Sequence, residues 1–255
     1  MRIFIGTCGN KVGLSRYVEC FNALEINATF YRFPSEKSLR NWEKVLAQLE
    51  DFRLALKVFQ GLTHPVGSPT WRKSGLSPEE QAALKGKVGC LRLTQATRAF
   101  FSQTLDLAER LSARYLLLQL PRNCESETGR FREFLGWARD LLAPRELHLA
   151  LEIRWEDPEL LEKLWEELKV VPAFDPLLFP RLWEKFQGLP RAYFRLHGER
   201  RGTRLIYHKK YTEEELQSLA RRIKALSAEE VLIFFNNVYM HEDALRFQKI
   251  LEAVF

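Results

Sequence analysis

The sequence predicts an α/β protein that folds as a single (β/α)8 barrel over residues 1–255. Eight short apolar runs rich in branched residues recur along the chain, and most are separated by stretches with helical periodicity. Eight strand–helix units in 255 residues give about 32 residues per unit, which is typical of this barrel. A doubly wound open sheet is the competing architecture. No repeat or linker-like segment divides the chain.

The eight predicted strands mostly end in a polar or turn-like cluster. They are Arg2–Gly6, Ala23–Asn27, Arg53–Val58, Tyr115–Leu120, His148–Ile153, Lys169–Phe174, Arg191–His197 and Val231–Asn236. The stretches between them carry helical patterns, and Thr212 and Glu215 have capping-box spacing at the start of one. These helices are predicted at Ser35–Glu50, Thr97–Ala113, Arg130–Leu142, Pro158–Leu168, Thr212–Leu226 and His241–Val254.

One predicted connection, residues 59–94, is much longer than the others and holds a short helical piece around Glu79–Lys85. It follows the third strand, on the face where barrel enzymes carry their active sites. Two interpretations stay open: a lid over the C-terminal mouth of the barrel, or an excursion on the surface.

Composition points to a globular protein outside the membrane. The chain is 46% apolar and 28% charged, and its 39 Lys+Arg against 33 Asp+Glu give a net charge of +6. No apolar run approaches the roughly 20 residues of a membrane span, and the N-terminus has no signal-peptide pattern, so we expect a cytoplasmic protein. The four cysteines form no CxxC pair and have no histidine at metal-ligand spacing, which predicts reduced thiols: Cys8, Cys20, Cys90 and Cys124.

Polar residues share one parity near the C-terminal ends of the predicted strands. Because side chains alternate along a strand, we expect these residues to point into the barrel around one mouth. Burying this many polar groups is costly, and packing alone explains them poorly, so the pattern predicts a ligand site. The residues are Glu25, Asn27, Lys57, Gln119, Glu152, Arg154, Asp175, Arg195, His197 and Asn236.

The residue types at this mouth favour an anionic ligand. Lys57, Arg154 and Arg195 supply cations, which suit phosphate or carboxylate groups. Glu25 and Glu152 form a candidate acid/base pair, and His197 can carry a proton near neutral pH. The remaining substrate-binding candidates are Asn27, Tyr31, His64, Gln119 and Asn236. A second phosphate candidate is the glycine-flanked, basic connection at 197–204.

A divalent metal is the alternative occupant of this mouth. Oxygen and imidazole ligands suit Mn, Mg or Zn, and the candidate ligands are Glu25, Glu152, Asp175 and His197. Arg154 competes for the Glu152 carboxylate, however, and no HxH or HExxH spacing occurs. We therefore predict no specific cofactor.

Ordered motifs resemble one family along essentially the whole chain. The segment EINATFYRFP, Glu25 to Pro34, is similar to the signature of the YecE-like family (domain of unknown function 72). Further motifs follow in the family's order: Gly6–Gly9, Leu56–Val58, Leu62–His64, Gln119–Pro121, Leu151–Arg154, Tyr193–Gly198 and Phe235–Asn237. The resemblance implies a (β/α)8 barrel and leaves the chemistry open. The chain departs from the family pattern after Gly9, at Trp155 and at Val238.

Two classes of function remain. The first is an enzyme that acts on a phosphorylated or carboxylated small molecule by proton transfer or hydrolysis. The second is a nucleic-acid-related protein, either a nuclease or a non-catalytic binder, by analogy with xylose-isomerase-like barrels. The small net charge and the lack of an RNP-like motif or recognition helix favour the first.

Overall fold

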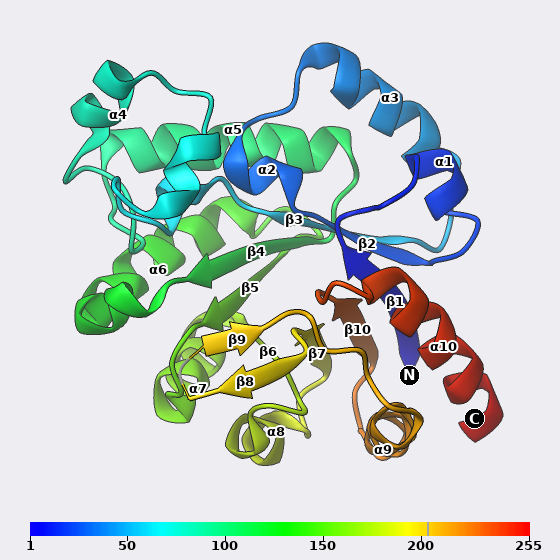
Figure 1. Cartoon of the computed structure of the whole chain (residues 1–255). Coiled ribbons are helices and arrows are strands. Elements are labelled where there is room, and N and C mark those ends of the chain that lie inside the picture. The colour runs from blue at the N-terminus through cyan, green and yellow to red at the C-terminus, as the bar shows by residue number, and fades with distance from the viewer. Residues whose placement is uncertain (203) are drawn as a thin grey trace. The chain divides into compact units, whose positions relative to one another are not determined.

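The computed structural model describes residues 1–202 and 204–255 (Figure 1). Eight strands form a closed barrel in the order β1-β10-β7-β6-β5-β4-β3-β2, which confirms the predicted barrel and excludes the open sheet. The barrel strands are β1 (Arg2–Cys8), β2 (Ala23–Ile26), β3 (Arg53–Lys57), β4 (Tyr115–Leu120), β5 (His148–Ile153), β6 (Val171–Phe174), β7 (Arg191–Leu196) and β10 (Glu230–Phe235). A separate antiparallel hairpin, β8 (Glu199–Arg201) and β9 (Arg204–Ile206), follows β7. Thr203 of the predicted phosphate connection lies outside the described residues.

Helices alternate with the strands largely as the sequence predicts. The longer ones are α3 (Glu36–Leu46), α5 (Gln95–Arg110), α6 (Phe131–Leu142), α7 (Pro158–Leu168), α9 (Glu213–Lys224) and α10 (Met240–Val254). The capping box of Thr212 and Glu215 is confirmed at the start of α9. Three short helices were not predicted: α1 (Leu14–Tyr17), α2 (Ala28–Tyr31) and α8 (Pro180–Phe186). No helix in the described ranges is long and apolar enough to cross a membrane.

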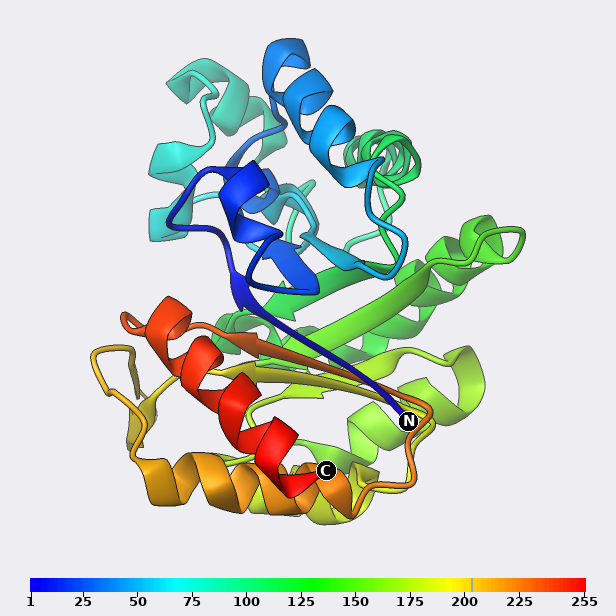
Figure 2. The same cartoon turned by 90° about the vertical axis from the view of Figure 1, so that its right-hand side faces the viewer.

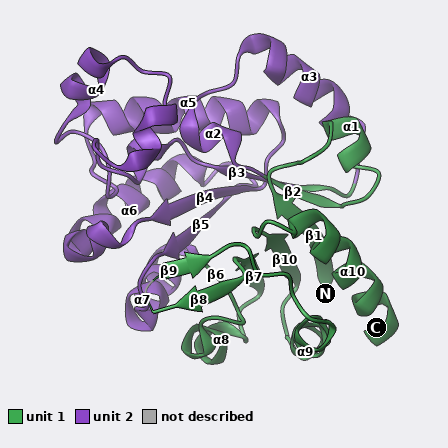
Figure 3. Ribbon diagram, viewed as in Figure 1, with its two compact units in different colours: residues 1–25, 51–53, 172–255 green, residues 26–50, 54–171 purple. Residues whose placement is uncertain are grey.

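The chain divides into two compact units (Figure 3). The first comprises Met1–Glu25, Asp51–Arg53 and Pro172–Phe255, and the second comprises Ile26–Glu50 and Leu54–Val171. In the first unit, α9 and α10 lie side by side (Figure 2). The organisation of residues 1–255 as one domain stays a prediction.

In the first unit, close packing of β1 on β2 places Glu25. Gly6 is opposite Ala23, and a Cβ on Gly6 would lie 2.0 Å from the Ala23 carbonyl oxygen, so only glycine allows this approach. The Tyr17 hydroxyl donates to that carbonyl at 2.9 Å and accepts from the Thr7 amide at 2.8 Å. The resulting register sets Cys8 opposite Glu25.

A buried carboxylate ties together the connections that follow β7 and β10 in the same unit. Asp243 is fully buried and accepts hydrogen bonds from the Tyr211 amide at 3.3 Å and from Asn237 Nδ2 at 2.6 Å. The Tyr211 hydroxyl in turn accepts from the Gly198 amide at 2.7 Å. Arg246 completes the group by an ion pair of 3.0 Å with Asp243.

In the second unit, the long connection packs around a small apolar cluster that it shares with neighbouring segments. It contains the 3-10 helices η1 (Gln60–Leu62) and η2 (Pro69–Lys73) and the helix α4 (Pro78–Leu84). Phe59, Trp71 and Val88 are buried at its centre. The segment is therefore an ordered layer, and its proposed role as a lid stays a prediction.

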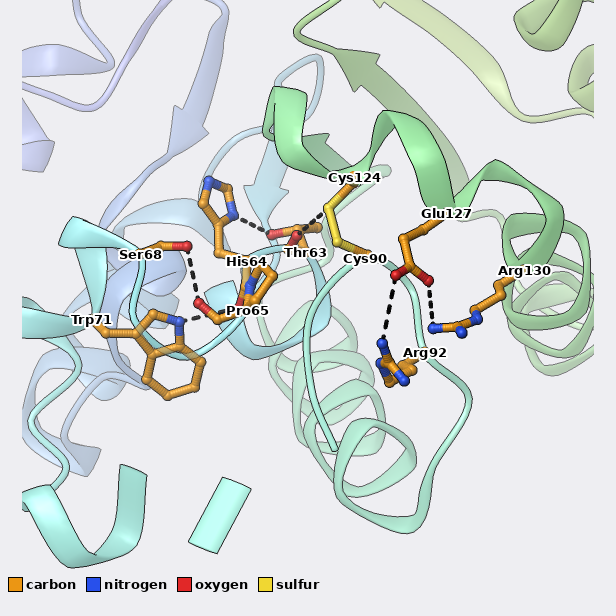
Figure 4. The surroundings of a disulfide bond; sticks show 10 residues. All are labelled: Thr63, His64, Pro65, Ser68, Trp71, Cys90, Arg92, Cys124, Glu127 and Arg130. Atoms are coloured by element: carbon orange, nitrogen blue, oxygen red, sulfur yellow. Dashed lines mark hydrogen bonds and ion pairs between the residues drawn. A yellow bond between two sulfur atoms is a disulfide. The ribbon is translucent and has the colours of Figure 1, made fainter. Parts of the chain in front are cut away.

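A disulfide joins this connection to the one after β4 (Figure 4). Cys90 pairs with Cys124 in the 3-10 helix η3 (Arg122–Arg130), with 5.3 Å between the Cα atoms. The prediction of four reduced thiols is therefore wrong for this pair, while Cys8 and Cys20 are free. The two cysteines are 34 residues apart and meet only because β3 and β4 are neighbours, which cysteine spacing does not reveal.

Candidate functional site

Two cationic side chains of the second unit meet on one amide oxygen at the ends of β3, β4 and β5. Lys57 Nζ donates to Gln119 Oε1 at 2.9 Å, and Arg154 Nη2 donates to the same atom at 3.3 Å. Gln119 is the register partner of Glu152, so both lie level on adjacent strands. Lys57, Gln119 and Arg154, which the sequence grouped by their shared parity, therefore contact one another in the structure.

Glu152 forms an ion pair with Arg154. Its Oε1 lies 2.9 Å from Arg154 Nη1, and the Glu152 side chain is only 4% exposed. The Arg154 side chain keeps 18% of its surface exposed. Nη1 contacts Glu152 and Nη2 contacts Gln119. A guanidinium has five N–H donors, and the exposed part of this one is accessible to a ligand.

Phe30 and His64 line the same group. Lys57 Nζ lies 4.0 Å from the centroid of the Phe30 ring, and the His64 ring packs edge-on against Phe30 at 4.9 Å. Thr63 Oγ1 is 2.8 Å from His64 Nδ1. Burial lowers the pKa of His64 to about 3, and the positive charges of Lys57 and Arg154 act in the same direction. His64 is therefore a neutral imidazole at neutral pH.

The depressed pKa of His64 predicts a pH dependence of stability. The unfolded histidine takes up a proton below about pH 6.5, whereas the folded one does so only near pH 3, so the unfolded state binds more protons in between. The free energy of unfolding should fall by about 1.4 kcal/mol per pH unit from this residue as the pH drops through that window. Urea unfolding of wild type and His64→Asn between pH 4 and about 6 measures the difference in slope. Equal slopes would contradict the account.

Asn27 directly precedes α2, and Tyr31 is the last residue of this helix. Asn27 Oδ1 is buried without a hydrogen-bond partner in the described part of the chain, and the Asn27 side chain does not cap α2. The Tyr31 ring packs on Phe30 at 5.0 Å, with Lys73 Nζ 5.1 Å from its centroid. The substrate-binding roles of Asn27 and Tyr31 stay predictions.

Glu25 and Arg195 form a fully buried ion pair in the first unit. Arg195 Nε donates to Oε2 at 2.9 Å and Nη2 donates to Oε1 at 2.8 Å, and the Tyr193 hydroxyl donates to Oε2 at 2.8 Å. The Cys8 sulfur lies 3.6 Å from Arg195 Nη2. Burial raises the pKa of both Tyr193 and Cys8 well above their usual values, and the Glu25 charge adds to the effect. This arrangement has the geometry of a structural ion pair.

Asp175, His197 and Asn236 form the other predicted group of the first unit. Asp175 accepts hydrogen bonds from the His197 amide at 2.7 Å and from the Leu177 amide at 2.9 Å, so it orders backbone. His197 Nδ1 lies 3.1 Å from Asn236 Nδ2, and the Tyr207 ring packs edge-on to the imidazole at 5.9 Å. The proton-transfer role of His197 stays a prediction.

The predicted metal ligands serve other contacts in the structure. Glu25 binds Arg195 and Tyr193, Glu152 binds Arg154, and Asp175 binds backbone amides. Within residues 1–202 and 204–255, no three His, Cys, Asp or Glu side chains gather as a metal-binding group.

Sequence reasoning missed three residues of these groups: Phe30, Thr63 and Tyr193. Phe30 and Thr63 lie outside the predicted strands, so the alternation of side chains could not place them. Tyr193 shares the parity of Arg195, which was a signal that both side chains point to the same face, but its contact with Glu25 depends on strand register.

Comparisons with known proteins give the family and the fold. A family model described as "Protein of unknown function DUF72" matches residues 4–254. A solved DUF72 family protein from Enterococcus faecalis V583 is 21% identical with a TM-score of 0.64, over 98% of this chain and 97% of that one. Endonuclease IV from Thermus thermophilus is 15% identical with a TM-score of 0.55, over 99% of this chain and 100% of that one.

A D-psicose 3-epimerase, solved in the presence of D-fructose, is 13% identical with a TM-score of 0.56, over 100% of this chain and 97% of that one. No curated protein matches the chain in sequence. At these identities the solved structures share the barrel fold, and they carry no argument for a common activity. Because the family model spans almost the entire sequence, the protein belongs to the DUF72 family, whose function is unknown.

Proposed function

We propose that the ends of β3, β4 and β5 bind the phosphate or carboxylate group of a small molecule through Lys57 and Arg154. The convergence of both cations on Gln119 Oε1 carries the proposal. An amide oxygen is neutral, so sharing it does little to offset the repulsion between two positive charges held this close. An anion beside them adds negative charge and accepts charge-assisted hydrogen bonds.

The surroundings of the two cations fit this role. Lys57 and Arg154 bring two positive charges to one amide oxygen, and Glu152 pairs with Arg154. His64 is neutral near neutral pH and offers a hydrogen-bonding ring atom without adding charge. The edge of the site is half-buried, because Lys57 and Arg154 both keep part of their surface exposed. A ligand anion there exchanges only part of its hydration for protein contacts.

Arg195 is not part of the proposed contact, although the sequence assigned it to substrate binding. Its guanidinium is fully buried against Glu25, and a ligand would have to compete with that carboxylate. The same contacts make Glu25 the least suitable of the three candidates for proton transfer. Acid–base chemistry at the proposed anion site is therefore assigned to Glu152, and turnover that Glu152→Gln abolishes without loss of binding would support it.

Thermal-shift measurements test the proposal with a panel of sugar phosphates, dicarboxylates, nucleotides and oligonucleotides. Lys57→Gln and Arg154→Gln should each weaken binding of a stabilising anion by about 10- to 100-fold, because a charge-assisted contact contributes roughly 1.5–3 kcal/mol. Lys163→Gln is the matched control, since it removes an exposed lysine on α7. Its affinity should equal that of wild type.

Three results would contradict the proposal. The first is that no anion stabilises the wild-type protein. The second is that the Lys57 and Arg154 variants bind as tightly as the control. The third is binding confined to oligonucleotides with a steep salt dependence, which would favour the nucleic-acid alternative.

A further inference from the structure

The Cys90–Cys124 disulfide connects the two loops that follow β3 and β4, the strands that carry Lys57 and Gln119 (Figure 4). Cys90 lies near the end of the long connection, and Cys124 lies in η3 directly after β4. Both side chains are buried. The bond is thus a covalent link between the two loops that follow the strands of Lys57 and Gln119.

Thr63 contacts both cysteines of the disulfide and also His64. The Thr63 carbonyl oxygen accepts a hydrogen bond from the Cys90 amide at 3.1 Å, and the Cys124 sulfur lies 3.5 Å from the same oxygen. The Thr63 hydroxyl is 2.8 Å from His64 Nδ1. His64 then packs on Phe30, whose ring also contacts the ammonium group of Lys57. A continuous set of contacts therefore runs from the disulfide to the proposed anion site.

The backbone beside Cys90 is held in a conformation that it would not adopt freely. Cys90 and Leu91 have φ values of 48° and 53°, which side chains other than glycine rarely adopt. The preceding residue, Gly89, is pressed against the 63–65 segment: a Cβ there would lie 2.4 Å from Pro65 N. Hydrogen bonds from the Gly89 and Leu91 amides to Gly61 and Leu62 complete the attachment. Cleavage of the disulfide removes one restraint on the backbone at Cys90 and Leu91, which is then free to leave this unfavourable conformation.

We propose that this disulfide controls the proposed anion site, so that the oxidised protein binds the anion and the reduced protein binds it more weakly. The proposal rests on the anion-binding function argued above. The reductant is a dithiol. Its first thiolate attacks the Cys90 sulfur, the Cys90–Cys124 bond breaks, and Cys124 leaves as a thiolate that takes up a proton. The second thiol of the reductant then displaces Cys90, which leaves as a thiolate and also takes up a proton, and the reductant becomes a cyclic disulfide. Two electrons pass to the protein.

Burial affects the rate of this reaction. The thiolate must approach the sulfur of a buried residue, so the loop at Gly89–Leu91 has to open before attack. We therefore expect reduction to be slow without denaturant. The number of free thiols per chain measures how far the reduction has gone. The oxidised chain has two free cysteines, Cys8 and Cys20, and the reduced chain has all four.

The test is a calorimetric titration with inorganic phosphate and with succinate, on the oxidised, the dithiothreitol-reduced and the re-oxidised wild-type protein. We expect reduction to weaken binding of the better probe by about tenfold or more and re-oxidation to restore it. The double variant Cys90→Ser/Cys124→Ser should bind like the reduced protein and ignore the reductant. Cys20→Ser is the control and should behave like wild type in both states.

A further variant examines the route through Thr63. Thr63→Val keeps the disulfide but removes the hydroxyl beside His64, so it should weaken binding in the oxidised state and reduce the effect of the dithiol. Equal affinity of oxidised and reduced protein would overturn the proposal. Unfolding on reduction would also overturn it, because the disulfide would then support the whole unit and would not adjust a site. Absence of binding by the oxidised wild type would instead refute the anion-binding function.

Discussion

Replacement of Arg195 by methionine should lower the free energy of unfolding by about 3–5 kcal/mol, because it leaves the buried Glu25 carboxylate without its cation. Both side chains have no exposed surface, so water cannot replace the lost contacts. The Tyr193 hydroxyl stays within 2.8 Å of Glu25 but compensates only part of the charge. Urea denaturation at neutral pH measures the effect.

Two further variants make this measurement specific. Arg201→Met breaks an exposed ion pair with Glu199 and should change stability by less than about 1 kcal/mol. The double variant Glu25→Gln/Arg195→Met should recover part of the loss, because no buried charge remains unpaired. A loss in Arg195→Met no larger than that in Arg201→Met would show that the Glu25–Arg195 pair is not the closed, buried contact described here.

Loss of the Cys90–Cys124 disulfide should lower the free energy of unfolding by about 3–4.5 kcal/mol, the second large effect that we expect. The bond closes a loop with a sequence separation of 34, and such a link restricts the unfolded chain. Denaturation of Cys90→Ser/Cys124→Ser beside wild type gives the value. The double variant should stay folded without denaturant, since native domains have about 5–15 kcal/mol of stability.

Two further denaturation measurements serve as controls for the disulfide prediction. Adding a dithiol to unfolded wild-type protein should bring its stability to that of the double variant, whereas Cys20→Ser should keep the wild-type value in the absence of reductant. Identical stability of wild type and double variant under oxidising conditions would contradict the structural role of the bond.

The barrel could be predicted from the sequence because each strand carries a local signal. Runs such as Tyr115–Leu120 and His148–Ile153 are continuous and apolar, and their predicted bounds equal the observed ones. Parity also grouped Gln119, Glu152 and Arg154 at one mouth, because the alternation of side chains does not depend on the exact strand ends. The structure adds that Gln119 and Glu152 are register partners and that Arg154 contacts Gln119. The short helix α2 gave no such signal, since four residues cannot display a helical period.

The partners of the predicted site residues could not be read from the sequence. Parity placed Arg195 with the other cations, but only the register of β1 with β2 and of β7 with β10 shows that Glu25 and Tyr193 surround it. The disulfide was missed for a related reason, because the spacing of the cysteines in the sequence does not show which loops contact each other in the fold. Contacts between distant segments depend on strand order, and that order exists only in the folded chain.

An experimental structure with a bound anion tests the central claim most directly. Crystals soaked with selenate, an analogue of sulfate and phosphate, allow the selenium position to be found from its anomalous signal without prior assumptions. Binding at Lys57 and Arg154 predicts a selenium peak with oxygens within hydrogen-bonding distance of Lys57 Nζ and the Arg154 guanidinium, at roughly 2.7–2.9 Å. The peak should vanish in Arg154→Gln crystals and persist in Lys163→Gln crystals. A peak elsewhere, with none beside these two cations, would contradict the claim.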